Sequence, residues 1–204
     1  MTITKIEKYK GQTYLVEIDA ENTYFLHQSI IAENSLHSDM EIDSDDFDDI
    51  LRQSYLRKAY ERALYLLDIR DYSYAEMFEK LNSNYDDDVC YETMEKLVRL
   101  NMIDDRRYAE NLARKLVEVK KYGYHKAVFE MKRKGIDREL CEEMLSAYSD
   151  TQDERLLELI SRKYSRYFDD EKGITKVKNA LVRQGYSFDS INRCIKAFME
   201  ENEF

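Results

Sequence analysis

The sequence predicts a mainly α-helical protein: a tandem array of three three-helix repeats preceded by a small N-terminal β module. The first observation is a period of fifty residues that relates three stretches of the chain, marked by Ser73, Gly123 and Gly173. The second is a set of turn residues in phase with that period, and the third is a strand-like pattern confined to residues 1–43. A fixed period of this kind is typical of repeat proteins, whose units bury their apolar faces partly against their neighbours.

The β module is expected over residues 1–43, where apolar and polar residues alternate with the period of a strand. Its candidate elements are strands at residues 3–9, 14–18 and 23–27, a short helical turn at 29–34, and a last strand at 40–43. Ser44 is expected to cap a long helix that ends near Arg70. Several aspartates in the first turn of that helix suit the positive end of its dipole.

The three repeats are expected at residues 44–105, 106–150 and 151–204. Each has apolar residues at positions that the period relates, which predicts one buried face per helix. These predicted core positions are Ala59, Ala109 and Leu159 in the first helices; Met77, Leu81, Ala127, Met131, Val177 and Leu181 in the second; and Cys90, Met94, Leu97, Leu140, Met144, Ala147, Ile191, Ile195 and Phe198 in the third.

The turns support this reading independently of the period. Asn84, Gly135 and Gly185 follow the second helix of each repeat, and Asn and Gly tolerate the left-handed conformation that closes a helix. Ser73 and Glu76 have the spacing of a capping box, which predicts a helix start between them. Asn101 is expected to close the third helix of the first repeat.

The sequence offers no sign of catalytic chemistry. The five glycines cannot form a phosphate-binding loop, and the three histidines (His27, His37, His125) lack the spacing of a zinc site. Cys90, Cys141 and Cys194 form no C-x-x-C pair and are interpreted as small buried residues in a reducing compartment. We therefore expect a binding protein with no catalytic residue, no cofactor and no metal.

No apolar stretch approaches the length of a membrane span, and the polar N-terminus lacks the apolar core of a signal peptide. These observations predict a cytoplasmic protein that does not enter the membrane.

The charges are distributed unevenly along the chain. Residues 1–50 contain three Lys and twelve Asp or Glu, whereas residues 106–135, the basic segment, contain ten Lys or Arg and three Glu. One interpretation is a solvated helix face; the other is a surface for phosphates or for an acidic protein. The candidate partner- or DNA-binding residues are Arg106, Arg107, Arg114, Lys115, Lys120, Lys121, Lys126, Lys132, Arg133 and Lys134.

The residues of the repeat also resemble the RecX family, the bacterial regulators of the RecA recombinase. Residues 70–77 look like the family's R-x-x-S-x-x-E-L, and residues 101–109 are similar to its junction of a glycine, two apolar residues and D-D-x-x-F-A. Residues 129–136 resemble E-L-x-x-K-G-I, and residues 182–191 resemble its third-repeat counterpart. The departures are Asn101 for Gly, Met77 and Met131 for Leu, and Tyr108 for Phe.

The resemblance implies an elongated, curved array that lies in the groove of the RecA–DNA filament. It implies inhibition of RecA ATP hydrolysis and strand exchange, and so a role in regulating recombination, DNA repair and the SOS response. The expected partner is the RecA filament, with weaker binding to single- or double-stranded DNA, and the expected state is a monomer. A nucleic-acid-binding helical module that uses the basic segment directly on phosphate is the alternative.

Overall fold

The N-terminal module is a four-stranded antiparallel sheet followed by a short helix. The computed structural model describes residues 1–202. The strands are β1 (Thr2–Lys10), β2 (Thr13–Ile18), β3 (Asn22–His27) and β4 (Met40–Glu41), in the order β3-β2-β1-β4, and α1 spans Gln28–Glu33. The predicted strands and helical turn are confirmed. The last strand ends two residues earlier than predicted, because the chain turns there into the next helix.

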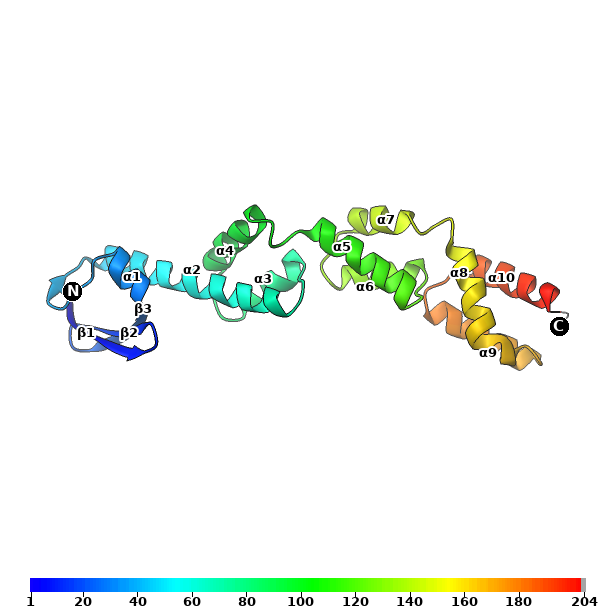
Figure 1. Ribbon diagram of the computed structural model, residues 1–204, viewed down its shortest axis with the longest axis horizontal. Helices are drawn as coiled ribbons and strands as arrows, with labels where there is room; N and C mark the ends of the chain where they lie inside the picture. Colours follow the sequence, from blue (N-terminus) through cyan, green and yellow to red (C-terminus); the bar gives the residue numbers. More distant parts are fainter. Residues whose placement is uncertain (203–204) are drawn as a thin grey trace. The chain divides into compact units, whose positions relative to one another are not determined.

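Helices α1 and α2 (Ser44–Ile69) lie on one side of this sheet (Figure 1). Val16 and Leu26 from the sheet are buried in one cluster with Phe47 and Ile50 from the first turns of α2. The ring centroids of Tyr24 and Phe47 are 5.0 Å apart in an edge-on arrangement. The sheet thus buries one face, and no helix within residues 1–202 covers the other, as is common for antiparallel sheets.

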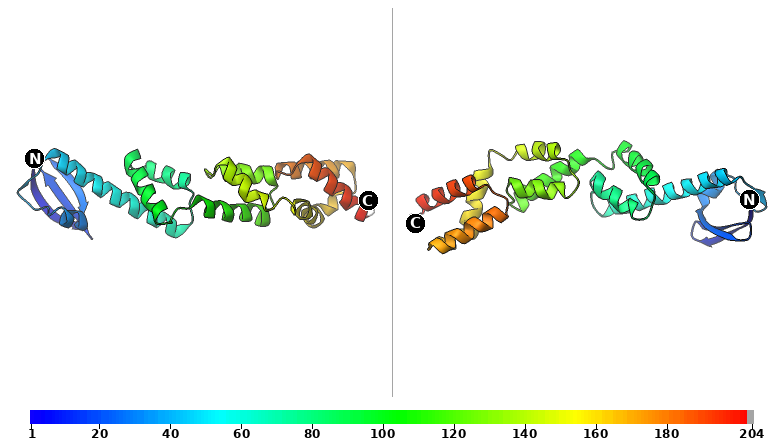
Figure 2. Two further views of the ribbon diagram at one scale, coloured as in Figure 1. Left: turned by 90° about the horizontal axis from the view of Figure 1, so that it is seen from above. Right: turned by 180° about the vertical axis from the view of Figure 1, so that it is seen from behind.

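Helix α2 is a single uninterrupted helix (Figure 2). Its cap differs from the prediction: Asp43 and not Ser44 is the N-cap, and its side chain accepts a hydrogen bond from the Asp45 N–H at 3.1 Å. The reason lies in the backbone. Asp43 has the extended conformation that an N-cap residue needs, whereas Ser44 is already the first residue of the helix.

The rest of the chain forms three three-helix units, as predicted. The first unit continues with α3 (Tyr74–Asn82) and α4 (Asp87–Arg99). The second contains α5 (Asp105–Arg114), the π-helical turn η1 (Lys115–Val119), α6 (Tyr124–Lys132) and α7 (Arg138–Ser146). The third contains α8 (Gln152–Leu159), the π-helical turn η2 (Ile160–Tyr164), the 3₁₀ turn η3 (Ser165–Tyr167), α9 (Glu171–Arg183) and α10 (Phe188–Glu201).

Two compact bodies contain these elements. One consists of residues 1–70 with 77–102, and the other consists of residues 71–76 with the chain from 103 onward. Within residues 1–202, none of the helices combines the length and the apolar character that crossing a membrane requires.

The predicted core is confirmed in the second helix of every repeat and in the third helices of the first and last repeats. It is wrong by one position in α7, where Cys141 and Leu145 are buried while Leu140 and Met144 are only partly buried and Ala147 is exposed. The loop before α7 has one residue more than the loop before α4, and this insertion shifts the buried face.

A second difference concerns the third repeat, in which Leu156 and Ile160 are buried and Leu159 is only partly buried. Helix α9 has an additional turn at its N-terminus compared with α6, so the fifty-residue period does not hold upstream of that turn. For the same reason Gly173 lies inside α9, whereas Gly123, fifty residues earlier, is the N-cap of α6. Asp170 is the N-cap, and it accepts a hydrogen bond from the Gly173 N–H at 2.6 Å.

The left-handed turns are confirmed at Gly135 (φ +78°), Gly185 (φ +89°) and Asn101 (φ +56°). The prediction is wrong for Asn84, which does not have a positive φ. Its backbone N–H donates to the Leu81 carbonyl at 2.9 Å, so α3 ends in a tighter right-handed turn that needs no special residue.

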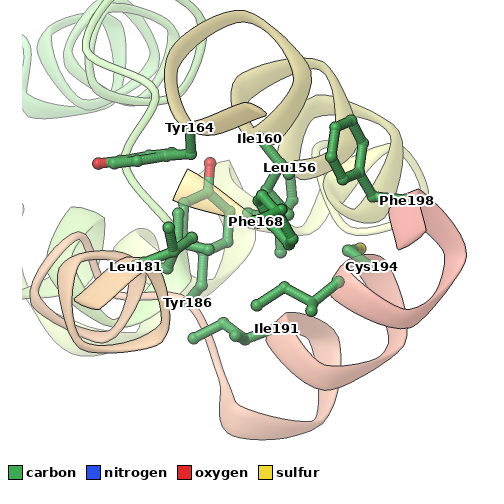
Figure 3. Packing of buried hydrophobic residues seen from close by; sticks show 11 residues of the cluster. Leu156, Ile160, Tyr164, Phe168, Leu181, Tyr186, Ile191, Cys194 and Phe198 are labelled. Atoms are coloured by element: carbon green, nitrogen blue, oxygen red, sulfur yellow. The ribbon is translucent and has the colours of Figure 1, made fainter. Parts of the chain in front are cut away.

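The third repeat has a core that includes several aromatic rings (Figure 3). The Phe168 and Phe198 rings pack 4.8 Å apart, beside the thiol-bearing Cys194. Tyr186 is almost fully buried, and its hydroxyl donates to the Lys121 carbonyl at 3.1 Å. Burial raises the pKa of Tyr186 to about 12.

Tyr186 therefore predicts a loss of stability at alkaline pH. The ordinary pKa of 10.0 applies in the unfolded chain. The stabilisation by the buried neutral phenol is thus complete below pH 10 and is lost as the pH rises through about 12. We expect the melting temperature of the native chain to exceed that of Tyr186→Phe by a constant amount below pH 10, and the difference to shrink above it. A difference that stays constant up to pH 12 would contradict this assignment.

Candidate partner-binding surface

The ten candidate cations lie in the second repeat, on α5, η1 and α6 and in the turns on either side of α6. Residues on the opposite side of α5 and α6, among them Ala109, Ala113, Ala127 and Met131, are fully buried. Seven of the ten cations are exposed, and three are partly buried: Lys121, Lys126 and Lys134. The set is distributed as Arg106, Arg107 and Arg114 in α5; Lys115 in η1; Lys120 and Lys121 before α6; Lys126 and Lys132 in α6; and Arg133 and Lys134 after it.

Two of the exposed arginines are in ion pairs within the repeat. Both terminal nitrogens of Arg106 donate to the Glu143 carboxylate on α7, and these hydrogen bonds raise the pKa of the guanidinium. Arg133 donates to Glu130 at 3.2 Å. Exposed pairs of this kind contribute about 0–1 kcal/mol each, so a partner could displace them at little cost.

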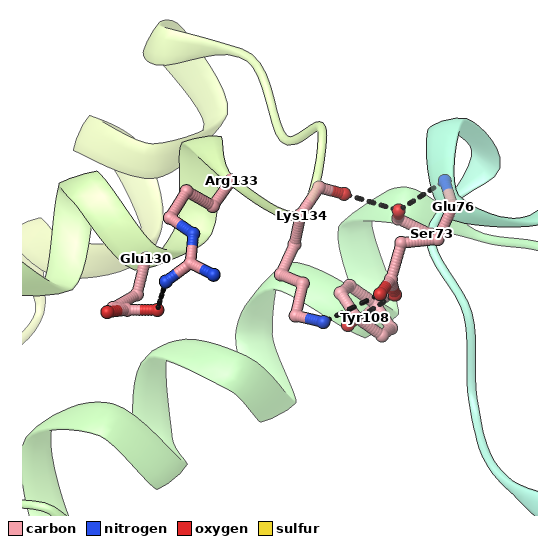
Figure 4. Close-up of polar contacts among 6 residues, drawn as sticks. All are labelled: Ser73, Glu76, Tyr108, Glu130, Arg133 and Lys134. Carbon is pink, nitrogen blue, oxygen red and sulfur yellow. Dashed lines mark hydrogen bonds and ion pairs between the residues drawn. The ribbon is translucent and has the colours of Figure 1, made fainter. Parts of the chain in front are cut away.

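Lys134 lies in a more enclosed network that joins the second repeat to residues 71–76 (Figure 4). Its ammonium group is 2.6 Å from one carboxylate oxygen of Glu76, and the Tyr108 hydroxyl donates to the other oxygen at 2.9 Å. The Ser73 hydroxyl donates to the Lys134 carbonyl and accepts a hydrogen bond from the Glu76 N–H at 3.1 Å. Ser73 thus fulfils its half of the predicted capping box, and the Glu76 carboxylate binds Tyr108 and Lys134.

We call this contact the first joint; it comprises Ser73, Ala75, Glu76, Tyr108, Lys134 and Gly135. Gly135 packs against Ala75 so closely that an added Cβ would lie 2.2 Å from the alanine methyl. Nearby, the Tyr74 N–H donates to Asp105 at 2.7 Å. Burial raises the pKa of Asp105, and this hydrogen bond partly offsets the rise.

A second joint with the same layout connects the second and third repeats. The Gly123 N–H donates to the Gln184 carbonyl at 2.9 Å, and the His125 N–H donates to the Gly185 carbonyl at 3.1 Å. These bonds satisfy backbone donors at the start of α6 that have no partner inside the helix. Lys121 also belongs to this joint: it has a left-handed backbone (φ +54°), its carbonyl accepts from Tyr186, and its ammonium lies 3.7 Å from Glu158.

Four lysines of the set, Lys115, Lys120, Lys126 and Lys132, have no carboxylate partner among residues 1–202. Lys120 and Lys126 lie 5.7 and 4.2 Å from the centroid of the Tyr122 ring. The open cationic surface is therefore made of Lys115, Lys120, Lys126 and Lys132, with Arg107, Arg114 and Arg133 as exposed neighbours in the sequence.

Phe129 was not among the predicted site residues. Its side chain is 58% exposed on α6, and the Arg133 guanidinium lies 5.9 Å from the centroid of its ring. The sequence could have identified Phe129 as an exposed residue. It is two positions from both Ala127 and Met131, which are buried, and so lies on the opposite side of the helix.

The described residues show no assembled metal site, since residues 1–202 contain no group of three or more His, Cys, Asp or Glu that could hold an ion. The cysteines are free and buried, as the sequence predicts. Burial raises the pKa of all three thiols, that of Cys194 to about 11. They are therefore protonated near neutral pH and act as small packing residues.

Comparisons with known proteins agree on one family. Models of the first, second and third three-helix domains of RecX match residues 59–97, 104–145 and 150–195. The chain is 26% identical over 207 residues to a protein of Clostridioides difficile named regulatory protein RecX, covering 99% of this chain and 98% of the relative. It is 30% identical over 146 residues to the protein of the same name from Prosthecochloris aestuarii, covering 71% and 96%.

Solved structures give the same result. The crystal structure of RecX from Lactobacillus salivarius has 29% sequence identity and a TM-score of 0.65, covering 71% of this chain and 96% of that one. Another RecX crystal structure matches 96% of this chain and 98% of its own with a TM-score of 0.71; at 21% identity this likeness concerns the fold. The chain belongs to the RecX family of regulatory proteins.

Proposed function

We propose that this protein binds the filament that RecA forms on DNA and inhibits its ATPase, recombination and repair activities, without catalysis of its own. Its membership of a family of regulatory proteins supports this proposal. The expected state is a cytoplasmic monomer that acts by occupying a surface of the filament.

The observation that carries the proposal is the open cationic surface of the second repeat. Lys115, Lys126 and Lys132 project from helices whose apolar faces are used in the core, and Lys120 lies in the turn before α6. None of the four is neutralised by a carboxylate in residues 1–202. Unpaired charges of one sign attract a partner of the opposite sign and orient its approach. The repeat architecture would add further contacts along a helical filament, so that weak individual contacts combine through effective concentration.

Direct binding to nucleic acid by the same surface is the second candidate. The exposed Phe129 ring beside Arg133 favours it, because aromatic rings with neighbouring cations are common in surfaces that bind single strands. The two candidates differ in their dependence on salt. If the four open lysines each met one phosphate of duplex DNA, affinity would fall roughly 150-fold between 50 and 200 mM salt.

A titration of RecA ATPase activity on single-stranded DNA tests the proposal. We expect this protein to lower the ATPase rate at both 50 and 200 mM salt, and to bind the filament more tightly than free DNA at 200 mM. The control is the same titration with the DNA-free recombinase. An ATPase rate that does not change at saturating protein would refute inhibition. Tight binding to free DNA at 200 mM salt would favour the second candidate.

A further inference from the structure

A hollow lies at the second joint, between the first turns of α6 and α10, and its volume is about 550 Å³. The lining residues are His125, Val182, Gly185, Tyr186, Ser187, Phe188 and Asp189, all of which belong to one compact body. The His125 N–H donates to the Gly185 carbonyl at 3.1 Å, and Lys126 occupies the space that a side chain at Gly185 would need. Part of the wall is therefore tightly held backbone, and the hollow is already formed in the folded chain.

The lining offers apolar surface and few free polar groups. Tyr186 belongs to the core of the third repeat (Figure 3), and its hydroxyl is already bonded to the Lys121 carbonyl at 3.1 Å. The Ser187 hydroxyl, at the N-cap of α10, accepts a hydrogen bond from the Ser190 N–H at 3.2 Å. Phe188, the first residue of α10, is 66% exposed although it borders the hollow, so most of its ring is left for a ligand to cover. Such a lining is typical of sites that take an apolar group.

The hollow adjoins the open cationic surface through α6. His125, Phe129 and Lys132 are spaced by four and three residues, so they lie on one face of that helix. Phe129 is 58% exposed, and Lys132 is exposed and without a carboxylate partner in residues 1–202. Lys126, which packs against Gly185, is also one of the four open lysines. Seven residues of helix span about 10 Å, so a short segment that enters the hollow can reach both lysines.

The charges around the hollow favour a protein segment over other occupants. A nucleic acid strand has a phosphate on every nucleotide, so one of them would lie close to Asp189 in the lining. A second copy of this chain that presented the same surface would bring Lys126 and Lys132 against like charges. A polypeptide, in contrast, can place an apolar side chain in the hollow and its carboxylates at the lysines.

We propose that this hollow receives an apolar side chain of a protein partner, while carboxylates on the same segment contact Lys126 and Lys132. The proposal rests on the function proposed above, because it assigns the RecA filament an anchor point on the surface of the second repeat. Interfaces commonly gain most of their affinity from a few side chains that fill pockets, and the charges around them orient the approach. Phe188 then contacts the partner's apolar side chain, and the two lysines contact its carboxylates.

The test is the affinity of the full chain for RecA filaments on single-stranded DNA, measured from 50 to 200 mM salt. We expect Phe188→Ala to bind about 10-fold more weakly at every salt concentration, because it removes apolar contact and no charge. Phe188→Leu should retain most of the affinity. Tyr65→Ala, which removes a similarly exposed ring (59%) from α2 in the other compact body, is the matched control and should have no effect. The double variant Lys126→Ala, Lys132→Ala should instead make the dependence on salt shallower.

Phe188→Glu provides a second variant that keeps the fold. A carboxylate at the first residue of α10 suits the positive end of the helix dipole, so the melting temperature should not fall. The new charge should repel the acidic segment, and we expect weaker binding than with Phe188→Ala. If the native chain, Phe188→Ala and Phe188→Glu all bound the filament equally, the proposal would be overturned while filament binding itself would stand.

A peptide probe distinguishes this proposal from the function on which it rests. The probe has one leucine between pairs of glutamates and is added to the full chain at 50 mM salt without RecA. We expect it to shift the amide NMR signals of Gly185 and Phe188, and a peptide with lysines in place of the glutamates to shift neither. Binding of the probe without any binding of the filament would refute the RecA function and retain the hollow as a protein site. Binding of neither would overturn both. An oligothymidylate of fifteen nucleotides that shifted the same signals would overturn the choice of a protein partner.

Discussion

Replacing Gly185 by alanine is expected to lower the melting temperature by about 5–10 °C. The residue has a left-handed backbone, in which a side chain costs about 1–3 kcal/mol. In addition, the new Cβ would lie 2.3 Å from the backbone nitrogen of Lys126, so the turn must move away from the start of α6. Each kcal/mol shifts the melting temperature of a chain of this size by roughly 2–4 °C. Circular dichroism during heating measures this shift.

Hydrogen exchange gives a local readout of the same change. The Gly123 and His125 amides donate to carbonyls of the Gly185 turn, so their exchange should accelerate when the turn moves. The matched control is Gly11→Ala. Gly11 also has a positive φ (+58°), but nothing lies within 4 Å of its added Cβ, so this variant shows the backbone strain alone. Equal melting temperatures for the two variants would show that close packing at the second joint contributes nothing.

The two joints explain why the period could be recognised in the sequence. Ser73 and Gly123 both lie at the start of a second helix, and Gly135 and Gly185 are the turns that pack against them, each sixty-two residues further along. Because the same close contact occurs in both joints, it restricts which residue types can occupy both positions of each pair. The period therefore survives at these positions and at the buried residues between them, such as Met131 and Leu181.

The errors in the core have a different cause, which is local in the chain. One additional loop residue before α7 and one additional turn in α9 shift the buried face, so that Cys141 and Leu156 take the place of Leu140 and Leu159. Both substitutes are also apolar. Because neighbouring apolar residues give almost the same helical pattern, the sequence alone could not distinguish them.

The candidate surface could be located from the charges, but its composition could not be predicted. Lys134 and Glu76 are fifty-eight positions apart, and Arg106 and Glu143 are thirty-seven apart. Their pairing depends on how helices from different parts of the chain pack. Counting charges along the sequence therefore gives the basic segment, while the division into joint residues, ion pairs and open lysines requires the structure.

Reversing the four open lysines of the second repeat is expected to abolish inhibition of RecA. The variant carries Lys115→Glu, Lys120→Glu, Lys126→Glu and Lys132→Glu, and it leaves the ion pairs of Arg106 and Lys134 in place. The reason is electrostatic: a surface that attracts a partner through unpaired cations repels the same partner after reversal. The measurement is RecA ATPase activity on single-stranded DNA, with helical content checked by circular dichroism. Because the four side chains contribute little to the core, the folded state should persist.

The third repeat provides a matched control for this prediction. Lys163, Lys172, Lys176 and Lys178 lie at its surface, and reversing them changes the net charge of the protein by the same amount. If location matters, the control variant retains inhibition while the variant of the second repeat loses it. Equal loss in both would indicate that the overall negative charge of the protein, and not a defined surface, weakens binding. Full inhibition by the variant of the second repeat would show that its lysines form only a solvated face, and the contact with RecA would then have to involve another part of the chain.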